Sequence, residues 1–410
     1  MNNQNYQLSL LAIFLVAVAI RVSLAAGFVG LGSPPDADAQ PDQIEYEALA
    51  WKPLAGEGYS WHGIPTARRM PGTSFSLMPV YAVFGRSYAA GRIWFCLMSA
   101  ATCLAAASLA TQLADRRTGV TAGAALAIYP NHAYYCMHFV SEVPYALCVT
   151  LATLSTLHCF ERDSKVSTAF GTGVCWGVTA LVRPNVLVAV CLLWILAMVY
   201  KDRRTVRLKK VAIVSATCVL ILLPLVIRNK VQIGAPMLSS VGSYTFWGAH
   251  NEQTLNTAPG SWIKTEDLAD ENHPFVGTEK ELNELAWKYG KDFVREHAAD
   301  MPYLTAMKLS RTLSPVADTS NVLLKYAFAA AWCIAGPLVL IGIIVEGRRD
   351  WWRSQIAGLA IWVTLATTLL FYGSVRFRDS VAPVYIAIGS IGLMALIRRF
   401  KSRTSKTSSA

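Results

Sequence analysis

The sequence predicts an all-α protein that crosses a membrane many times, and its composition, its long apolar blocks and its charge distribution each predict this. Of its 410 residues, 54% are hydrophobic and 15% are charged, whereas soluble globular proteins carry about 25% charged residues. Several apolar blocks reach the roughly 20 residues that a helix needs to cross the bilayer core. These observations exclude an ordinary soluble domain and a disordered chain.

The apolar blocks predict about ten transmembrane helices. They lie at residues 8–30, 88–111, 119–130, 140–160, 168–182, 185–200, 211–227, 323–345, 354–373 and 379–397. The first block is too long for the core of a signal peptide and has no basic region before it, so we expect a retained helix. Pro130 and Pro184 interrupt the pattern and predict broken or tilted helices. The shorter stretch 73–85 is expected to enter only the membrane interface.

Short basic strips orient these helices. Residues 201–210 carry six Lys/Arg and one Asp, and the tail from Arg398 carries five basic residues and no acid. With ten spans these strips fall on one face, together with Arg348, Arg349 and Arg353, and the positive-inside rule makes that face cytoplasmic. We therefore expect a multi-pass cell-membrane protein with both termini in the cytoplasm. The net charge of +11 lies in such strips rather than in a groove for phosphates, so we expect no nucleic-acid partner.

Two long segments, 31–72 and 228–322, remain for the extracytoplasmic face. The first holds six Asp/Glu and three Lys/Arg, and the second holds twelve acids and nine bases. Function concentrates in long loops whose ends are held by a scaffold. A capping box that begins at Thr278 predicts a helix within the second loop. We expect residues 1–400 to form a single transmembrane domain and 401–410 to form a disordered cytoplasmic tail.

The cysteines and histidines predict no metal site. None of the nine cysteines forms a CxxC pair, and nearly all fall within or beside apolar blocks, where they behave as small hydrophobic residues. The seven histidines show no metal-ligand spacing. A disulfide framework is not expected either.

Asp42 is the first candidate for catalysis. It lies in the segment PDQIEYEALA, just beyond the outer end of the first span, and Tyr46 and Leu49 follow on the same face of a short predicted helix. A carboxylate there could take a proton from a hydroxyl or hold a divalent cation, Mg²⁺ or Mn²⁺, beside a phosphate. A solvated acidic loop explains the same spacing. Tyr46 is a candidate substrate-binding residue.

Arg69 and Glu142 are two further candidates. Arg69 precedes Met-Pro-Gly at the membrane surface, and a guanidinium there can bind a lipid phosphate through two parallel hydrogen bonds. The alternative is an arginine that only anchors the helix. Glu142 begins an apolar block at the predicted outer face, where a carboxylate is costly unless it is paired or functional. As an alternative, Glu142 complements the dipole at a helix N-terminus.

Four more arginines are predicted at the same membrane level. Arg183, Arg228, Arg376 and Arg378 lie at outward ends of spans, on the face that should be poor in basic residues. Their convergence with Arg69 predicts an anion site at the outer interface. Separate ion pairs with loop acids are the alternative.

The segment 242–251 combines aromatic and amide side chains. Trp247, His250 and Asn251 are candidate substrate-binding residues, because an aromatic face and polar groups together suit a sugar ring. An interfacial aromatic belt has the same composition.

Taken in order, these segments resemble the GT-C type of integral-membrane glycosyltransferase, in particular the family 39 group with its aminoarabinose transferases and protein O-mannosyltransferases. The resemblance covers most of the chain. It rests on an ordered series of motifs, namely PDQIEYEALA at 41–50, RMPG at 69–72, YP and SE near 129–142, GxxxLxRP at 177–184, PLVIRN at 224–229 and RFRDSVAP at 376–383.

The resemblance implies a GT-C-like bundle with two long extracytoplasmic loops and a polyprenyl-phosphate monosaccharide as donor. It implies that Asp42 is the base for the acceptor, that Arg69 binds the donor phosphate and that Glu142 occupies a second acidic position. The sequence departs from the family at Gln43, where many relatives have a second acid, and at Glu45, where aminoarabinose transferases tend to carry a basic residue. We expect no separate C-terminal soluble domain.

The sequence therefore predicts an inverting membrane glycosyltransferase that moves a hexose or pentose to an acceptor hydroxyl on a lipid, a glycan or a protein. Its partners would be the lipid-linked donor, the acceptor and membrane lipids. No cofactor is certain, although a divalent cation is compatible with the chemistry. A transporter or flippase of lipid-linked sugars, or a non-catalytic membrane scaffold, remains as an alternative.

Overall fold

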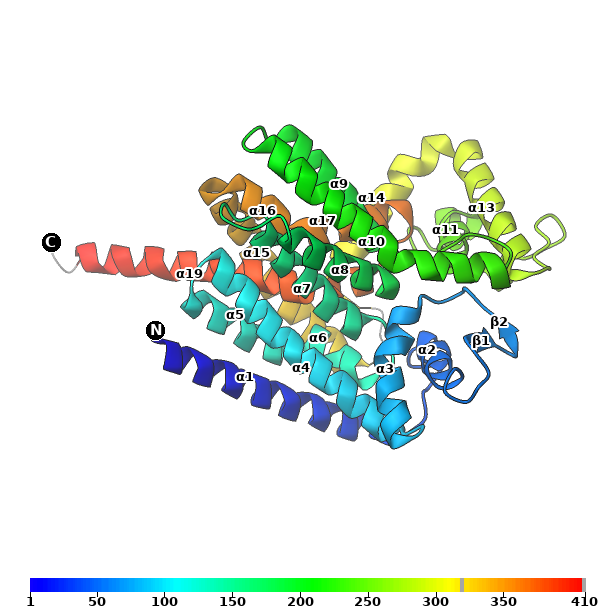
Figure 1. The fold of residues 1–410 in the computed structure, drawn as a ribbon, viewed down its shortest axis with the longest axis horizontal. Helices are drawn as coiled ribbons and strands as arrows, with labels where there is room; N and C mark the ends of the chain where they lie inside the picture. The colour runs from blue at the N-terminus through cyan, green and yellow to red at the C-terminus, as the bar shows by residue number, and fades with distance from the viewer. Residues whose placement is uncertain (318–320, 408–410) are drawn as a thin grey trace.

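The computed structural model describes residues 1–317 and 321–407, which are almost entirely helical (Figure 1). The expectation of an all-α fold is confirmed. The helices that run along the bundle are α1 (Asn3–Leu24), α4 (Tyr88–Leu113), α5 (Arg116–Ile128), α7 (Glu142–Cys159), α8 (Thr168–Val182), α9 (Leu187–Val199), α10 (Arg204–Gln232), α15 (Val322–Arg349), α16 (Trp351–Ala357), α17 (Leu359–Leu370) and α19 (Ala382–Thr407).

Five of the described helices are long and apolar enough to cross a membrane. They span Asn3–Val29, Tyr88–Leu113, Arg204–Gln232, Val322–Arg349 and Ala382–Ser402. A sixth span arises if α16 and α17, which meet at a bend of 55°, are counted as one broken helix. The multi-pass character is thereby confirmed, while the expected total of about ten stays a prediction. The apolar blocks at 119–130, 140–160, 168–182 and 185–200 also form helices, but these are shorter or less apolar than a full span.

Both prolines interrupt helices as expected. Pro130 begins a separate short helix, α6 (Pro130–Tyr134), directly after α5, and Pro184 opens a 3-10 turn between α8 and α9. Proline lacks the N–H that would continue the preceding helix, and its ring clashes with the earlier turn.

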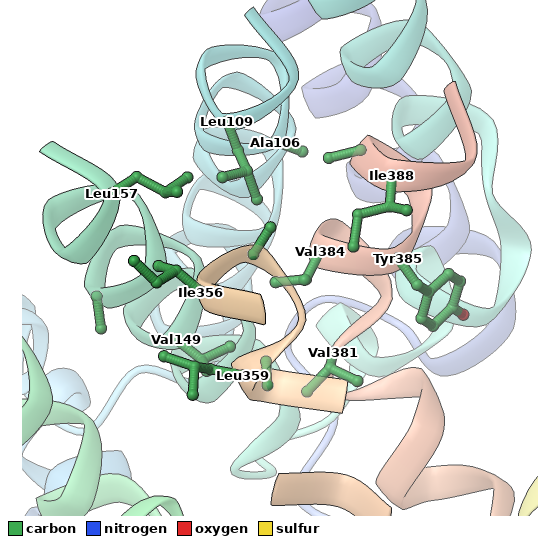
Figure 2. Close-up of a cluster of buried hydrophobic side chains, with 14 of the residues drawn as sticks. Ala106, Leu109, Val149, Leu157, Ile356, Leu359, Val381, Val384, Tyr385 and Ile388 are labelled. Atoms are coloured by element: carbon green, nitrogen blue, oxygen red, sulfur yellow. The ribbon is translucent and has the colours of Figure 1, made fainter. Parts of the chain in front are cut away.

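The core lies where α4, α7, α16, α17 and α19 meet (Figure 2). Leu109, Val149, Leu359 and Val384 are fully buried there, and Tyr385 lies at its edge. Lipid tails are as apolar as leucine, so helices in a membrane associate through close packing rather than through the hydrophobic effect. The many small residues of α4 permit that close approach.

The two predicted long loops gather at one end of the bundle, and both chain termini lie at the other end (Figure 1). The elements at the loop end are α2 (Asp42–Trp51), β1 (Ser60–Trp61), β2 (Ile64–Pro65), α3 (Pro71–Phe84), α11 (Val241–Ala249), α12 (Glu252–Asn256), α13 (Glu279–Glu296), α14 (Met301–Leu313) and α18 (Val375–Asp379). The predicted capping box is present, because Thr278 caps α13 and exchanges hydrogen bonds with Glu281.

The expectation of a disordered tail from residue 401 is wrong for residues 401–407, which continue α19. No proline or glycine, which would interrupt a helix, occurs in this stretch. Residues 408–410 lie outside the described part of the chain.

Candidate active site

Acidic and basic side chains alternate in one continuous chain at the loop end of the bundle. The order is Glu45, Arg69, Asp42, Arg376, Glu142 and Arg183. Arg69 donates from Nε to Glu45 Oε2 at 2.8 Å and from Nη2 to Asp42 Oδ1 at 2.7 Å. Arg376 donates from Nη2 to Asp42 Oδ2 at 3.1 Å and from Nε to Glu142 Oε1 at 2.7 Å. The site therefore joins three residues of the first loop with Arg376 from the short helix α18 and with Glu142 and Arg183 at two helix ends.

Helix α2 positions Asp42, which is its first residue. A carboxylate is stabilised at a helix N-terminus by the helix dipole. The helix is held against α3 because Ser74 Oγ donates to the carbonyl of Tyr46 at 2.8 Å, and because Arg86 binds the buried Glu47 through two hydrogen bonds of 2.9 and 2.7 Å. The ring of Tyr46 lies beneath Arg69, whose guanidinium carbon is 5.4 Å from the ring centroid. Tyr46 thus lies beside the charged chain, and its role in substrate binding stays a prediction.

The segment RMPG places Arg69 beside the end of α8. Met70 is extended and Pro71 starts α3. A Cβ on Gly72 would lie 2.7 Å from the backbone of Leu181, so only glycine permits this contact between α3 and α8. Because α8 ends at Val182, the contact brings Arg69 to the level of Arg183.

Glu142 begins α7 and its side chain is only 1% exposed. Arg183 Nη2 lies 2.7 Å from Glu142 Oε1, and Arg183 Nε donates to Ser141 Oγ at 3.0 Å. The guanidinium carbon of Arg183 also lies 5.0 Å from the ring centroid of Tyr145. Glu142 is therefore paired with two arginines, which offsets the cost of burying its charge.

Helix α18 supplies Arg376 to the site. Ser374 caps this short helix by accepting from the backbone N–H of Arg376. The preceding Gly373 lies against the backbone of Lys308 in α14, so closely that a Cβ there would overlap the Lys308 carbonyl. The second outer loop thus determines where Arg376 stands.

The pKa of Asp42 lies below its ordinary value. Burial alone would raise it, but the positive charges of Arg69 and Arg376 outweigh that effect. The acidic partners raise the pKa values of both arginines above an already high value, although burial opposes this. Arg68 adds a further cation 3.5 Å from Glu45. Arg68 also lies 4.0 Å from Glu266, so four carboxylates balance the four arginines, and an anion would bind here by taking guanidinium hydrogen bonds from a carboxylate.

Two predicted arginines lie elsewhere. Arg378 donates to Asp379 at 3.0 Å and to the carbonyl of Ser314 at 2.6 Å, with its guanidinium carbon 4.1 Å from the ring centroid of Trp332. Arg228 donates to the carbonyls of Tyr59 and Thr66 at 2.8 and 2.6 Å. The expected convergence of all five arginines is thus wrong for these two, because backbone carbonyls, and for Arg378 also Asp379, hold their donors.

Arg228 instead holds both ends of the β1–β2 hairpin. The strands pair Ser60 with Pro65 and Trp61 with Ile64, and the turn residues His62 and Gly63 both have positive φ, 50° and 77°. Such a turn matches the twist of the strands it joins.

The three candidate sugar-binding residues make their contacts within the second loop. Trp247 is buried against Phe275 and Tyr289, with ring centroids 5.1 and 5.0 Å apart. Asn251 caps α12 and donates to the carbonyls of two residues in α11. His250 donates from Nδ1 to the carbonyl of Phe246 at 2.8 Å and accepts at Nε2 from Lys308 Nζ at 2.8 Å. Packing, capping and hydrogen bonding thus occupy these side chains, and none of their contacts reaches the charged chain.

Sequence reasoning did not assign Glu45, Arg68 and Ser141 to the site. Glu45 could have been found, because it lies three positions after Asp42 on a predicted helix and so shares its face. Arg68 and Ser141 each adjoin a candidate residue, which is a weaker signal.

The charged chain does not present the ligands of a metal ion. No group of three or more His, Cys, Asp or Glu side chains that could hold a metal occurs in residues 1–317 and 321–407. Between Asp42 and Glu142, the place where a bridging cation would bind is taken by the guanidinium of Arg376.

The chain is thus a helical membrane protein with a half-buried cluster of acids and arginines at the loop end, and its fold is GT-C-like. Residues 68–227 match the model of the family described as dolichyl-phosphate-mannose-protein mannosyltransferase. That match includes Arg69, Glu142 and Arg183, whereas Asp42 and Arg376 lie outside it. No curated protein matches the sequence.

Solved structures share the fold. The archaeal oligosaccharyltransferase AglB from Archaeoglobus fulgidus, in complex with an inhibitory peptide and a dolichol-phosphate, aligns over 98% of this chain and 52% of its own, with a TM-score of 0.57 at 12% identity. A second structure of that enzyme, tethered to an acceptor peptide containing the NVT sequon, aligns over 95% and 50%, with a TM-score of 0.54 at 14% identity.

ArnT from Cupriavidus metallidurans bound to undecaprenyl phosphate aligns over 96% of this chain and 78% of its own, with a TM-score of 0.44 at 12% identity. The chain spans about half the length of the archaeal oligosaccharyltransferase. The expected resemblance to GT-C proteins is confirmed at the level of the fold.

Proposed function

We propose that this protein is a membrane glycosyltransferase that moves a monosaccharide, with inversion, from a polyprenyl-phosphate donor to an acceptor hydroxyl. The observation that carries the proposal is the position of Asp42 between Arg69 and Arg376, at 2.7 and 3.1 Å. A carboxylate that can take a proton thus stands beside two guanidinium groups that can hold a phosphate.

The donor phosphate binds Arg69 and Arg376. The hydrogen bonds of these arginines to Asp42 are then shared with the phosphate or broken. Because these cations keep the pKa of Asp42 low, their engagement by phosphate raises it toward the ordinary value and makes Asp42 a better base. Asp42 then takes the proton of the acceptor hydroxyl while that oxygen attacks the anomeric carbon. The bond from this carbon to the phosphate oxygen breaks, and the two arginines stabilise the charge that develops on the phosphate. Arg183 and Glu142 keep Arg376 in place.

The family match and the dolichol-phosphate of the archaeal oligosaccharyltransferase support a lipid-phosphate donor. The acceptor is a lipid, a glycan or a protein. The peptides bound by the archaeal enzyme do not favour any one of these three acceptor classes for this chain. Positive charge at the end of the bundle that carries the termini supports a cytoplasmic position for both termini and an extracytoplasmic active site. No step is assigned to a divalent cation, because Arg376 already bridges the two carboxylates.

The test uses membranes with the wild type, Asp42→Asn or Asp38→Asn, supplied with a mixed pool of polyprenyl-phosphate sugars and a cell-envelope extract as acceptor. Mass spectrometry follows each sugar-lipid and the free polyprenyl phosphate. Asp38 is the matched control because it is an exposed acid of the same loop. We expect one sugar-lipid to disappear, with release of polyprenyl phosphate, in the wild type and Asp38→Asn only.

Equal consumption by Asp42→Asn would remove Asp42 from the mechanism. Movement of an intact sugar-lipid across the membrane, without release of polyprenyl phosphate, would overturn transfer in favour of transport.

A further inference from the structure

A second charged site lies at the end of the bundle opposite Asp42. Helix α7 begins at Glu142 in the active site and runs for 18 residues, which at 1.5 Å per residue is about 27 Å. A cavity of about 370 Å³ opens where α7 ends and α10 begins, and residues of the α9–α10 turn line it. That turn is visible as the green loop beyond α9 in Figure 1. The proposed transfer reaction uses none of its residues.

The lining of this cavity carries an excess of positive charge. Five basic side chains line it, namely Arg162, Arg203, Arg207, Lys210 and Arg353. Only three acids do so, namely Glu161, Asp202 and Asp350. The cavity therefore has a formal excess of two positive charges.

The basic side chains divide into those held by the protein and those open to a ligand. Lys210 Nζ donates to the carbonyls of Cys159 and Ser164 at 2.7 and 3.0 Å, and Arg207 is bound to Asp202. Arg203 uses Nη1 on the carbonyl of Arg162, at 2.6 Å. Within the described part of the chain, neither Arg162 nor Arg203 has a carboxylate partner. Two guanidinium groups at the mouth are thus available for an anion.

The walls of the cavity suit a lipid better than a small soluble ion. Arg207 lies over two neighbouring aromatic rings, with its guanidinium carbon 4.4 Å from the centroid of Tyr200 and 4.2 Å from that of Trp352. Tyr200 directly follows α9, whose last residues include Met198 and Val199, 48% and 64% exposed. A molecule held at the mouth by its phosphate could therefore lay acyl chains along the exposed apolar face of α9.

We propose that this cavity binds the phosphodiester headgroup of an anionic phospholipid, with Arg162 and Arg203 as its main phosphate contacts. Basic pockets between membrane helices are suited to such headgroups, and the planar guanidinium matches phosphate geometry. Aromatic side chains with one apolar face and one polar edge fit the membrane interface, where the headgroup would lie. The site is separate from glycosyl transfer and does not depend on it.

The test measures lipid binding to the purified full chain by native mass spectrometry in mild detergent, with phosphatidylglycerol and phosphatidylcholine as probes. The variant is Arg162→Gln with Arg203→Gln. The matched control, Arg204→Gln with Lys209→Gln, removes two exposed charges from the neighbouring strip that do not line the cavity. Each basic residue near an anionic lipid contributes about 1 kcal/mol. We therefore expect the first pair to weaken phosphatidylglycerol binding by about 10- to 30-fold and the control pair by about twofold.

Arg203→Lys should retain phosphatidylglycerol binding, and this distinguishes loss of charge from loss of fold. Equal weakening by both pairs would show that the basic strip attracts lipid diffusely. Equal binding of phosphatidylcholine, whose phosphate charge is balanced by its choline, would show that the net negative charge of the lipid is not recognised. Either result overturns the proposal. Displacement of the lipid by inorganic phosphate, at constant ionic strength, would assign the cavity to a soluble phosphate instead.

Discussion

Arg376 Nη2 lies 3.1 Å from Asp42 Oδ2, although 334 positions separate the two residues in the chain. The same guanidinium donates from Nε to Glu142 Oε1 at 2.7 Å. One planar group therefore holds two carboxylates at a defined separation, and it can turn toward a phosphate without leaving the site. A lysine would not fix that separation, because its ammonium is a compact charge whose three donors rotate freely.

Arg376→Lys is expected to lower kcat by about 100-fold, and Arg376→Gln by up to about 1000-fold, the range seen when one electrostatic donor to the transition state is removed. The measurement is release of polyprenyl phosphate under saturating donor. Arg117→Lys, at an exposed arginine, is the control and should retain full activity. Wild-type kcat in Arg376→Lys would show that the bidentate geometry has no role.

Glu142→Gln is expected to destabilise the protein by about 3–5 kcal/mol, because it leaves Arg183 without a charged partner and removes one of the two carboxylates that hold Arg376. Thermal unfolding in detergent measures this. Glu161→Gln serves as the control, since Glu161 lies just beyond the other end of the same helix and is exposed. An unchanged unfolding midpoint in Glu142→Gln would mean that the two arginines find other acceptors.

Gly72→Ala is expected to push α3 away from α8, because the new methyl group would lie 2.7 Å from the Leu181 backbone. Such overpacking costs about 1–3 kcal/mol. It should also slow transfer, since Arg69 moves with the start of α3. Gly171→Ala on α8 is the control, because it meets no atom within 4 Å. Equal activity of the two variants would contradict the role of this contact.

Acidification from about pH 6.5 to 4 is expected to lower stability through His250. Burial, assisted by the charge of Lys308, lowers the pKa of His250 from 6.5 to about 4. In this window the unfolded chain binds a proton that the folded protein does not, so folding weakens as pH falls. The measurement compares unfolding free energy against pH for the wild type and His250→Gln, whose curve should be flatter. Parallel curves would refute this assignment.

Chelation of divalent cations is expected to leave transfer unchanged, because Arg376 occupies the position between Asp42 and Glu142 where a cation would bridge them. The experiment compares initial rates with EDTA and with added Mg²⁺ or Mn²⁺. A rate that falls with EDTA and returns with one metal would show that a cation enters the site together with the donor.

Local sequence patterns predicted the helices and part of the site. The apolar blocks became helices, and the spacing of Asp42 and Tyr46 placed both residues on the helix that begins the first loop. The partners of each residue could not be predicted in the same way. Arg376 and Arg378 share the same outward end of a span, yet Arg376 lies beside Asp42 whereas Arg378 binds Asp379 and backbone carbonyls. Residues two positions apart on a helix point in different directions.

By itself, the sequence determined that this protein is a helical membrane protein with acids and arginines near the ends of its spans, since hydrophobic length and charge bias are local properties. Only the tertiary structure decided which charges meet. Asp42, Glu142 and Arg376 come from three distant segments, and their contacts depend on close helix packing at Gly72 and Gly373. Such contacts depend on how the helices are placed relative to one another, and the local spacing of residues in the sequence does not determine that placement.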